Sequence, residues 1–354
     1  MLQLQTIREN KEEIILALGK RNIDAQTLLD NVLQLDEKRR TTQTQLDNVL
    51  AESNSLSKEI GALYKTGKAQ EANVLKEKTV HLKEESKQLG EDLNAAAEEL
   101  QNLLYQIPNA PHTSVRKGSS EEDNEEVFKE GDIPTLDTTA LPHWELAKKY
   151  DIIDFELGVK IAGAGFPVYK GKGARLQRAL IAYFLDKNTE AGYTEIQVPH
   201  LVNELSGYGT GQLPDKEGQM YHVTADDLYL IPTAEVPITN IFRDVIVNES
   251  DFPITYTGYT PCFRREAGSY GAHVRGLNRL HQFDKVEIVR VEHPTKSYEA
   301  LDGMVEHVKN ILRELKLPYR ILRLLAGILE NYQTPEGIKI PDVLVPYCGF
   351  EMID

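Results

Sequence analysis

Apolar residues recur at alternating steps of three and four positions within residues 1–105, a stretch that contains no proline. This spacing places them on one helical face, in two long series. The series, in which Ser53 is a polar member, are Leu46, Val49, Ser53, Leu56, Ile60 and Leu63, followed by Leu75, Leu82, Leu89, Leu93, Ala96, Leu100 and Leu103. With Gly67 suited to a turn between them, the pattern predicts two long helices folded into an antiparallel hairpin. We expect earlier helices over 6–18 and 25–35 to pack near its base. The same periodicity is also typical of a generic dimerising coiled coil.

Proline, glycine and serine interrupt regular structure after this arm. Pro108, Pro111 and residues 118–120 break helices, and the acidic run 121–126 has the composition of a solvated segment. The sequence therefore predicts a helical arm at 1–108, a linker at 109–140 and a second domain at 141–354.

Helical and alternating segments are mixed in the second domain, which predicts the α+β class. A helix is expected from residue 174, followed by a turn at Gly192 and a strand that begins at Ile196 and is interrupted by Pro199. The segment 297–315 predicts an amphipathic helix without a catalytic role. Its inward face would consist of Leu301, Met304, Val308, Ile311, Leu312 and Leu315. The basic segment Lys170–Gly173 lacks the spacing of a phosphate-binding P-loop.

Composition narrows the classes of function. The net charge of −15 argues against a protein that coats nucleic acid generally, although a local basic patch could still bind RNA. The two cysteines, Cys262 and Cys348, fit a reducing cytosol and have no metal-site spacing, so no metal ligands are predicted. The N-terminus does not read as a signal peptide, and no apolar run is long enough to span a bilayer. We expect a soluble cytoplasmic protein.

The segment 260–287 carries the clearest chemistry. Arg264 has the planar fork that grips a phosphate or carboxylate, and Glu266 can accept a hydrogen bond from an exocyclic amine. Phe283 offers a flat face to a purine, and it alternates in phase with Lys285 and Glu287 along one strand face. A surface ion pair between Arg264 and Glu266, and a core role for Phe283, are the competing interpretations.

Basic residues follow within the same segment. His273, Arg275 and Arg279 lie in a glycine-rich loop and could contact the end of a nucleic acid. His281, in a strand-like run, is interpreted as structural.

The whole segment 260–287 resembles motif 2 of class II aminoacyl-tRNA synthetases, and its residue sequence is similar to that of seryl-tRNA synthetases. The helix, turn and strand of 163–202 resemble motif 1, which builds a dimer interface in that family. The resemblance implies an antiparallel catalytic sheet flanked by helices and ATP-dependent attachment of L-serine to tRNA(Ser), and also tRNA(Sec), through a seryl adenylate. It implies ATP and Mg²⁺ as cofactors and a homodimer as the assembly.

The resemblance also assigns roles to residues. Arg264 would be the catalytic arginine, contacting the α-phosphate and the serine carboxylate. The ATP site would comprise Arg264, Arg265, Glu266 and Phe283, and the serine site Thr233, Ala234, Glu235 and Glu287. The arm would hold the long variable arm of tRNA, with Lys76 and Lys83 as candidate contacts beside Arg275 and Arg279 of the basic loop.

The resemblance breaks at Leu324–Ala326. A strand-like run at 319–324 passes directly into helical spacing at 325–332, without a turn residue or a helix N-cap. The family continues there through strands that carry the Mg²⁺ ligands, further serine contacts and the motif-3 arginine. The sequence therefore predicts an incomplete sheet and puts catalytic competence in question.

Three other functions stay open. The chain could be a catalytically impaired relative that binds tRNA, which the missing block favours and the intact segment 260–287 disfavours. It could be a structural coiled-coil dimer, or another amino-acid ligase with a class II site, although such a ligase has no use for the long arm.

Overall fold

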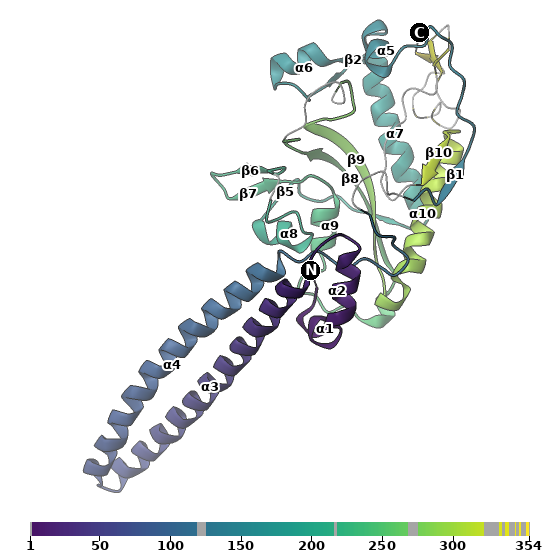
Figure 1. Cartoon of the computed structure of the whole chain (residues 1–354). Helices are drawn as coiled ribbons and strands as arrows, with labels where there is room; N and C mark the ends of the chain where they lie inside the picture. The colour runs from purple at the N-terminus through teal and green to yellow at the C-terminus, as the bar shows by residue number, and fades with distance from the viewer. Residues whose placement is uncertain are drawn as a thin grey trace. The chain divides into compact units, whose positions relative to one another are not determined.

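The computed structural model in Figure 1 describes residues 2–118, 125–215, 218–267 and 275–321, and beyond them only 333–334, 337–339, 344, 347 and 352–353. The chain divides into two compact units, Met1–Asn124 and Glu125–Asp354. Helices and small sheets are mixed in it, as the sequence predicts. In the described ranges, no helix combines the length and apolar character needed to cross a membrane.

The first unit contains the predicted hairpin. Helices α3 (Gln26–Lys65) and α4 (Ala69–Leu104) run side by side and are joined by a short turn, in which Gly67 has a φ of 77° that favours glycine (Figure 1). The seam between the helices buries Val49, Leu56 and Leu82. The separate helix expected over 25–35 is wrong, because it is the start of α3. Residues 36–45 are polar but contain no glycine or proline that would end a helix.

Two short helices, α1 (Leu4–Glu9) and α2 (Lys11–Gly19), pack against the base of the hairpin. Their apolar side chains share a buried cluster with the start of α3 and the end of α4. Asp36 is fully buried there and accepts two hydrogen bonds of 2.7 Å from the Arg8 guanidinium. Burial opposes ionisation of Asp36, but the hydrogen bonds and charge of Arg8, Arg39 and Arg40 hold its pKa below the usual value.

The second unit is organised around a long antiparallel hairpin (Figure 1). Strands β8 (Ile254–Phe263) and β9 (Gln282–Val291) pair from Ile254↔Val291 to Phe263↔Gln282, and β4 (Thr194–Glu195) runs parallel to β8. Helix α7 (Gly171–Glu190) covers one face, where Gln177 donates to Asp284. Helix α9 (Glu235–Asn240) packs near the other face through Ile238, beside Val198. The predicted helix and the turn at Gly192 are present, but the predicted position of the strand is wrong, because β4 covers only Thr194–Glu195 and ends before Ile196.

Smaller elements surround this hairpin. A three-stranded sheet has the order β5 (Leu201–Val202), β7 (Leu228–Leu230), β6 (Tyr221–Val223), and β2 (Ile153–Asp154) pairs with β3 (Val168–Tyr169). The remaining elements are α5 (His143–Lys149), α6 (Phe155–Ile161), α8 (Glu204–Gly209), η2 (Glu249–Asp251), η4 (Pro294–Lys296), α10 (Ser297–Glu314), β11 (Gln333–Thr334), β12 (Gly337–Lys339) and β13 (Met352–Ile353).

The interval predicted as a linker contains a strand. β1 (Phe128–Glu130) pairs antiparallel with β10 (Tyr319–Ile321), and the Glu130 carboxylate accepts hydrogen bonds from Arg313 at 2.9 and 3.0 Å. These partners lie far away in the sequence, so local composition does not reveal them. The domain boundaries near 108 and 141 stay predictions. Residues 121–124, His273 and Leu324–Ala326 lie outside the described residues.

Helix α10 has only part of the predicted inward face. Ile311 and Leu315 are buried in a cluster with Tyr183 of α7, whereas Leu301 is 51% and Val308 38% exposed within the described structure. Periodicity identifies an apolar face, but the length over which a neighbour covers it depends on tertiary packing.

Candidate functional site

One face of the β8–β9 hairpin gathers the predicted chemistry. Because side chains alternate along a strand, Phe283, Lys285 and Glu287 point to the same face of β9. Their direct partners on β8 are Cys262, Thr260 and Gly258. Cys262 and Thr260 are fully buried, and burial raises the pKa of the Cys262 thiol. Cys262 therefore stays protonated at neutral pH and is not a candidate nucleophile.

A glycine lets α9 approach this face. A Cβ atom added to Gly258 would lie 2.9 Å from the carbonyl oxygen of Ile196 and 3.1 Å from the Cδ1 atom of Ile238. A larger residue there would push α9 away from the strand. The close packing places the segment before α9, with Thr233 and Ala234, beside Glu287.

The predicted serine-binding residues form one hydrogen-bonded group. Thr233 donates from Oγ1 to the Glu287 carboxylate at 2.5 Å, and the backbone N–H of Glu235 donates to the same oxygen at 3.0 Å. Ala234 is fully buried beneath them and packs with Ile238. This arrangement fixes the Glu287 carboxylate at the start of α9, where it can accept hydrogen bonds from a small cationic or hydroxylated ligand.

Glu235 adds a second carboxylate to this group. Its side chain is open to solvent, yet loss of part of its hydration raises its pKa, and the negative charge of Glu287 raises it further. Lys285 opposes this shift. Two neighbouring carboxylates and one lysine make an acidic site that favours an ammonium group.

Lys285 is the residue that was missing from the predicted binding set. Its Nζ atom lies 3.0 Å from Oε1 of Glu287 and donates to Thr233 Oγ1 at 2.9 Å. Its in-phase alternation with Phe283 and Glu287 placed it on the right face. The contact with Thr233, 52 positions away, depends on the packing of α9 and could not be read from the sequence.

Arg264 lies over the ring of Phe283. Its Cζ atom is 5.0 Å from the ring centre, and its backbone N–H donates to the carbonyl oxygen of His281 at 2.9 Å. Both side chains are half-buried, so the pair presents a planar cation and an aromatic face at the site. His281 itself is held by a 2.8 Å hydrogen bond with the hydroxyl of Tyr221 and stacks on Phe166.

Glu266 pairs with Arg279 instead of Arg264. The Arg279 Nη1 atom lies 3.2 Å from Glu266 Oε2, and only 11% of the Glu266 side chain is exposed. A predicted ATP-binding residue and a predicted tRNA-binding residue are thus in contact. Arg265 is exposed, and its backbone N–H donates to Gln219 at 2.9 Å.

Other predicted contacts are distributed along the chain. Arg275 is exposed at the end of the basic loop, where the backbone N–H of Leu277 donates to the His143 ring at 2.9 Å. On the arm, Lys76 and Lys83 are exposed and make no ion pair with a described residue, whereas Lys78 pairs with Glu52 at 2.6 Å.

A chain of hydrogen bonds supports Glu287 from the opposite face. His307 of α10 contacts Asn188 Oδ1 at 2.7 Å, Asn188 donates to Thr257 Oγ1 at 2.8 Å, and Thr257 donates to the Glu287 carbonyl at 2.9 Å. Asn188 and Thr257 are buried. Because Asn188 donates to Thr257, its oxygen accepts from His307, which fixes the Nε2–H tautomer of the ring.

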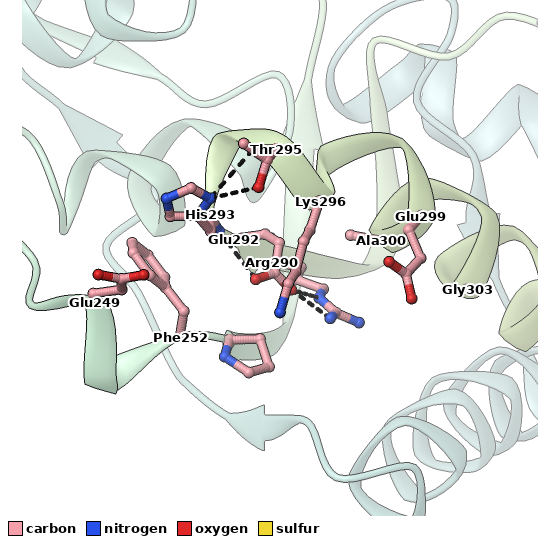
Figure 2. Close-up of a pocket in the computed structure, with 11 residues that line it drawn as sticks. Glu249, Phe252, Arg290, Glu292, His293, Thr295, Lys296, Glu299, Ala300 and Gly303 are labelled. Carbon is pink, nitrogen blue, oxygen red and sulfur yellow. Dashed lines mark hydrogen bonds and ion pairs between the residues drawn. The ribbon is translucent and has the colours of Figure 1, made fainter.

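A separate hollow of about 620 Å³ lies further along the hairpin (Figure 2). Arg290 is paired with Glu292, and His293 is paired with Thr295. Lys296 lines the hollow together with Glu292, Glu249 and Glu299, so the lining has mixed charge and does not favour an anion. None of the predicted site residues lines it.

In the described part of the chain, no three His, Cys, Asp or Glu side chains are grouped so that they could hold a metal ion. The residues predicted for ATP and serine therefore do not fit a Mg²⁺ centre by themselves, and we assign no chemical step to a metal.

Comparison with known proteins identifies both parts of the chain. Residues 1–111 match the seryl-tRNA synthetase N-terminal domain, and residues 221–340 match the tRNA synthetase class II core domain (G, H, P, S and T). A serine–tRNA ligase of Salinibacter ruber is 49% identical over 92% of this chain and 76% of the relative. One from Prosthecochloris aestuarii is 37% identical over 100% of this chain and 99% of the relative. The crystal structure of seryl-tRNA synthetase from Pyrococcus horikoshii complexed with ATP has a TM-score of 0.88 at 26% identity, covering 100% of this chain and 99% of that chain.

This chain is shorter than those relatives. The match to the P. aestuarii protein extends over 429 positions against the 354 residues of this chain, which leaves at least 75 positions without a residue here. The sequence predicts the missing block near Leu324–Ala326, and that position stays a prediction.

Proposed function

The chain belongs to the seryl-tRNA synthetase family, and from this membership we propose that it activates L-serine with ATP and transfers the seryl group to tRNA(Ser). The observation that carries the proposal is the grouping of Thr233, Lys285 and Glu287 on the same strand face as Arg264 and Phe283. An acidic group that would suit an ammonium ligand lies there next to a cation and an aromatic ring, a combination that suits an amino acid joined to a nucleotide.

In the first step, a carboxylate oxygen of serine attacks the α-phosphorus of ATP. The bond from that phosphorus to the pyrophosphate oxygen breaks, and pyrophosphate leaves. Arg264 would bind both the serine carboxylate and the α-phosphate, with Phe283 against the adenine ring and Arg265 near the phosphates. Glu266 would accept from the adenine amino group once Arg279 releases it. Positioning of the two substrates and stabilisation of the developing charge by Arg264 would contribute most of the rate enhancement.

Serine would be selected by the group around Glu287. Glu235 and Glu287 would accept hydrogen bonds from the ammonium and hydroxyl groups of serine, and Thr233 would hold Glu287 in place. A site built from satisfied polar partners rejects an analogue that lacks the hydroxyl, because those partners are then left unpaired. In the second step, a 3′-terminal ribose hydroxyl of the tRNA attacks the seryl carbonyl carbon, and AMP leaves.

The arm and a dimer complete the proposal. Lys76 and Lys83 on the arm and Arg275 and Arg279 on the catalytic unit would contact tRNA phosphates, of tRNA(Ser) and also of tRNA(Sec). Exposed apolar side chains on α8 and after α9, including Leu205 at 62% and Ile246 at 96%, support a homodimer interface near the motif-1 segment. We place the reaction in the cytoplasm, where translation uses its product.

A second candidate function is supported by the shortfall of at least 75 positions. In that case the chain binds tRNA and the adenylate but catalyses neither step efficiently, because part of the ATP clamp is missing.

Binding of a non-hydrolysable seryl-adenylate analogue, the sulfamoyl adenosine of L-serine, tests the proposed site. Calorimetry should detect one site in the wild-type chain, and Arg264→Ala should weaken binding by roughly 10- to 100-fold, because a charged hydrogen-bonding fork is lost. Arg290→Ala, which removes a paired arginine from the same strand, serves as the control and should bind normally. A folded wild-type chain that does not bind the analogue would contradict the proposal.

A further inference from the structure

We infer that Lys285 is a positioning residue of the serine site, which holds Glu287 in its binding orientation and lets Glu235 and Glu287 both carry a negative charge when the amino group arrives. This inference rests on the proposed function, because it takes the ligand of the site to be an amino acid.

The geometry gives Lys285 two partners that meet at the same carboxylate. Its ammonium group lies 3.0 Å from Oε1 of Glu287 and donates to Thr233 at 2.9 Å, while Thr233 donates to Oε2 of Glu287. Each carboxylate oxygen of Glu287 is therefore held by a different residue. The Thr233 and Glu287 side chains are well shielded, with 15% of the Glu287 side chain exposed. Loss of Lys285 would leave one oxygen of Glu287 without this partner.

The charges around the site show why a cation is needed. Glu235 and Glu287 are the carboxylates of this group, Cys262 stays neutral, and Arg264 is the nearby cation on the Phe283 side. Two neighbouring carboxylates without a cation favour protonation of one of them. An ammonium ligand would then have to displace a proton before it could bind.

The predicted consequence is a change in pH dependence. With Lys285 in place, its charge opposes the rise in the Glu235 pKa that burial and Glu287 cause, so we expect serine to bind with little proton uptake or release. In Lys285→Met, which keeps most of the side-chain length and removes the charge, the acid limb of serine binding should move to higher pH by about one unit. At pH 7 the dissociation constant for serine should rise at least about tenfold.

The chain offers a matched control on the same strand. Arg290 pairs with Glu292 two positions later, as Lys285 pairs with Glu287, but it lies outside the site. Arg290→Met should leave both the affinity for serine and its pH profile unchanged. Lys285→Arg, which restores the charge, should recover the wild-type pH profile at least in part.

Two measurements separate this inference from the proposed function. The first is calorimetric titration with L-serine between pH 5.5 and 8.5. The second is an NMR titration of ¹³C-labelled glutamate side chains in the ligand-free wild-type chain and in Lys285→Met. We expect a glutamate titration in Lys285→Met that is shifted to higher pH, together with weaker serine binding.

Unchanged glutamate titration and an unchanged serine pH profile in Lys285→Met would overturn the inference. If the glutamate titration is shifted in Lys285→Met but the wild-type chain does not bind serine, the charge-balancing role of Lys285 is upheld and the serine site is overturned. Thermal unfolding of each variant identifies a loss of binding that comes from misfolding.

Discussion

At the scale of the residue, the site depends on hydrogen-bond partners that hold the Glu287 side chain and backbone in place. Glu287 is fixed at its side chain by Thr233 and Lys285 and at its carbonyl by Thr257. The chain of hydrogen bonds behind Thr257 leads to His307. Burial lowers the pKa of His307, although the charge of Glu314 opposes that shift. His307 therefore donates to Asn188 as a neutral ring, and this support becomes sensitive to acid.

The pH dependence of stability should reveal this histidine. Because the pKa of His307 is lower in the folded state than the usual value of about 6.5, the unfolded chain binds a proton more readily. The stabilising contribution is complete above about pH 6.5 and declines as the pH falls toward the folded-state pKa. His307→Gln keeps a donor for Asn188 but cannot take up a proton. In this variant, the loss of unfolding free energy that protonation of His307 causes at acid pH should disappear.

Urea unfolding at pH 7.5 and 5.5 measures this effect. His200→Gln, at an exposed position of the same unit, is the control and should keep the wild-type pH dependence. Equal pH dependence in His307→Gln and the wild-type chain would show that His307 does not titrate as described.

At the scale of the element, the arm and the sheet differ in how far the sequence determines them. The heptad series predicts the hairpin of α3 and α4 because each residue contacts neighbours that the same pattern specifies. The alternation of β9 likewise places Phe283, Lys285 and Glu287 on one face. Pairing of β1 with β10, the contact between Lys285 and Thr233, and the exposure of Leu301 depend on distant segments, and no local pattern encodes them.

The arm provides a prediction of its own. Replacing Lys76 and Lys83 together by glutamine should weaken binding of tRNA(Ser). It should also reduce the slope of the logarithm of the binding constant against the logarithm of the salt concentration, by the equivalent of up to about two phosphate contacts. Binding of the seryl-adenylate analogue should not change, because that ligand does not need the arm. Filter binding across a range of salt concentrations measures both the affinity and the slope.

Lys78→Gln is the matched control for this variant. Lys78 lies on the same helix but is paired with Glu52, so its loss should affect tRNA binding less. If the double variant and Lys78→Gln bind tRNA(Ser) like the wild-type chain, α4 does not present Lys76 and Lys83 to the RNA.

At the scale of the whole molecule, two properties constrain the function. A net charge of −15 requires that tRNA be held by local basic groups, and the chain lacks at least 75 positions of its match to the P. aestuarii relative. The described residues nevertheless bring the serine group and the pair of Arg264 and Phe283 onto one strand face. The central claim is that this face activates serine.

Serine-dependent exchange of labelled pyrophosphate into ATP tests that claim most directly, because it reports adenylate formation without requiring tRNA. We expect exchange by the purified chain that depends on L-serine and falls by at least about 100-fold in Arg264→Ala. A folded chain that binds the seryl-adenylate analogue but supports no exchange would contradict serine activation and leave a tRNA-binding relative that has lost catalysis.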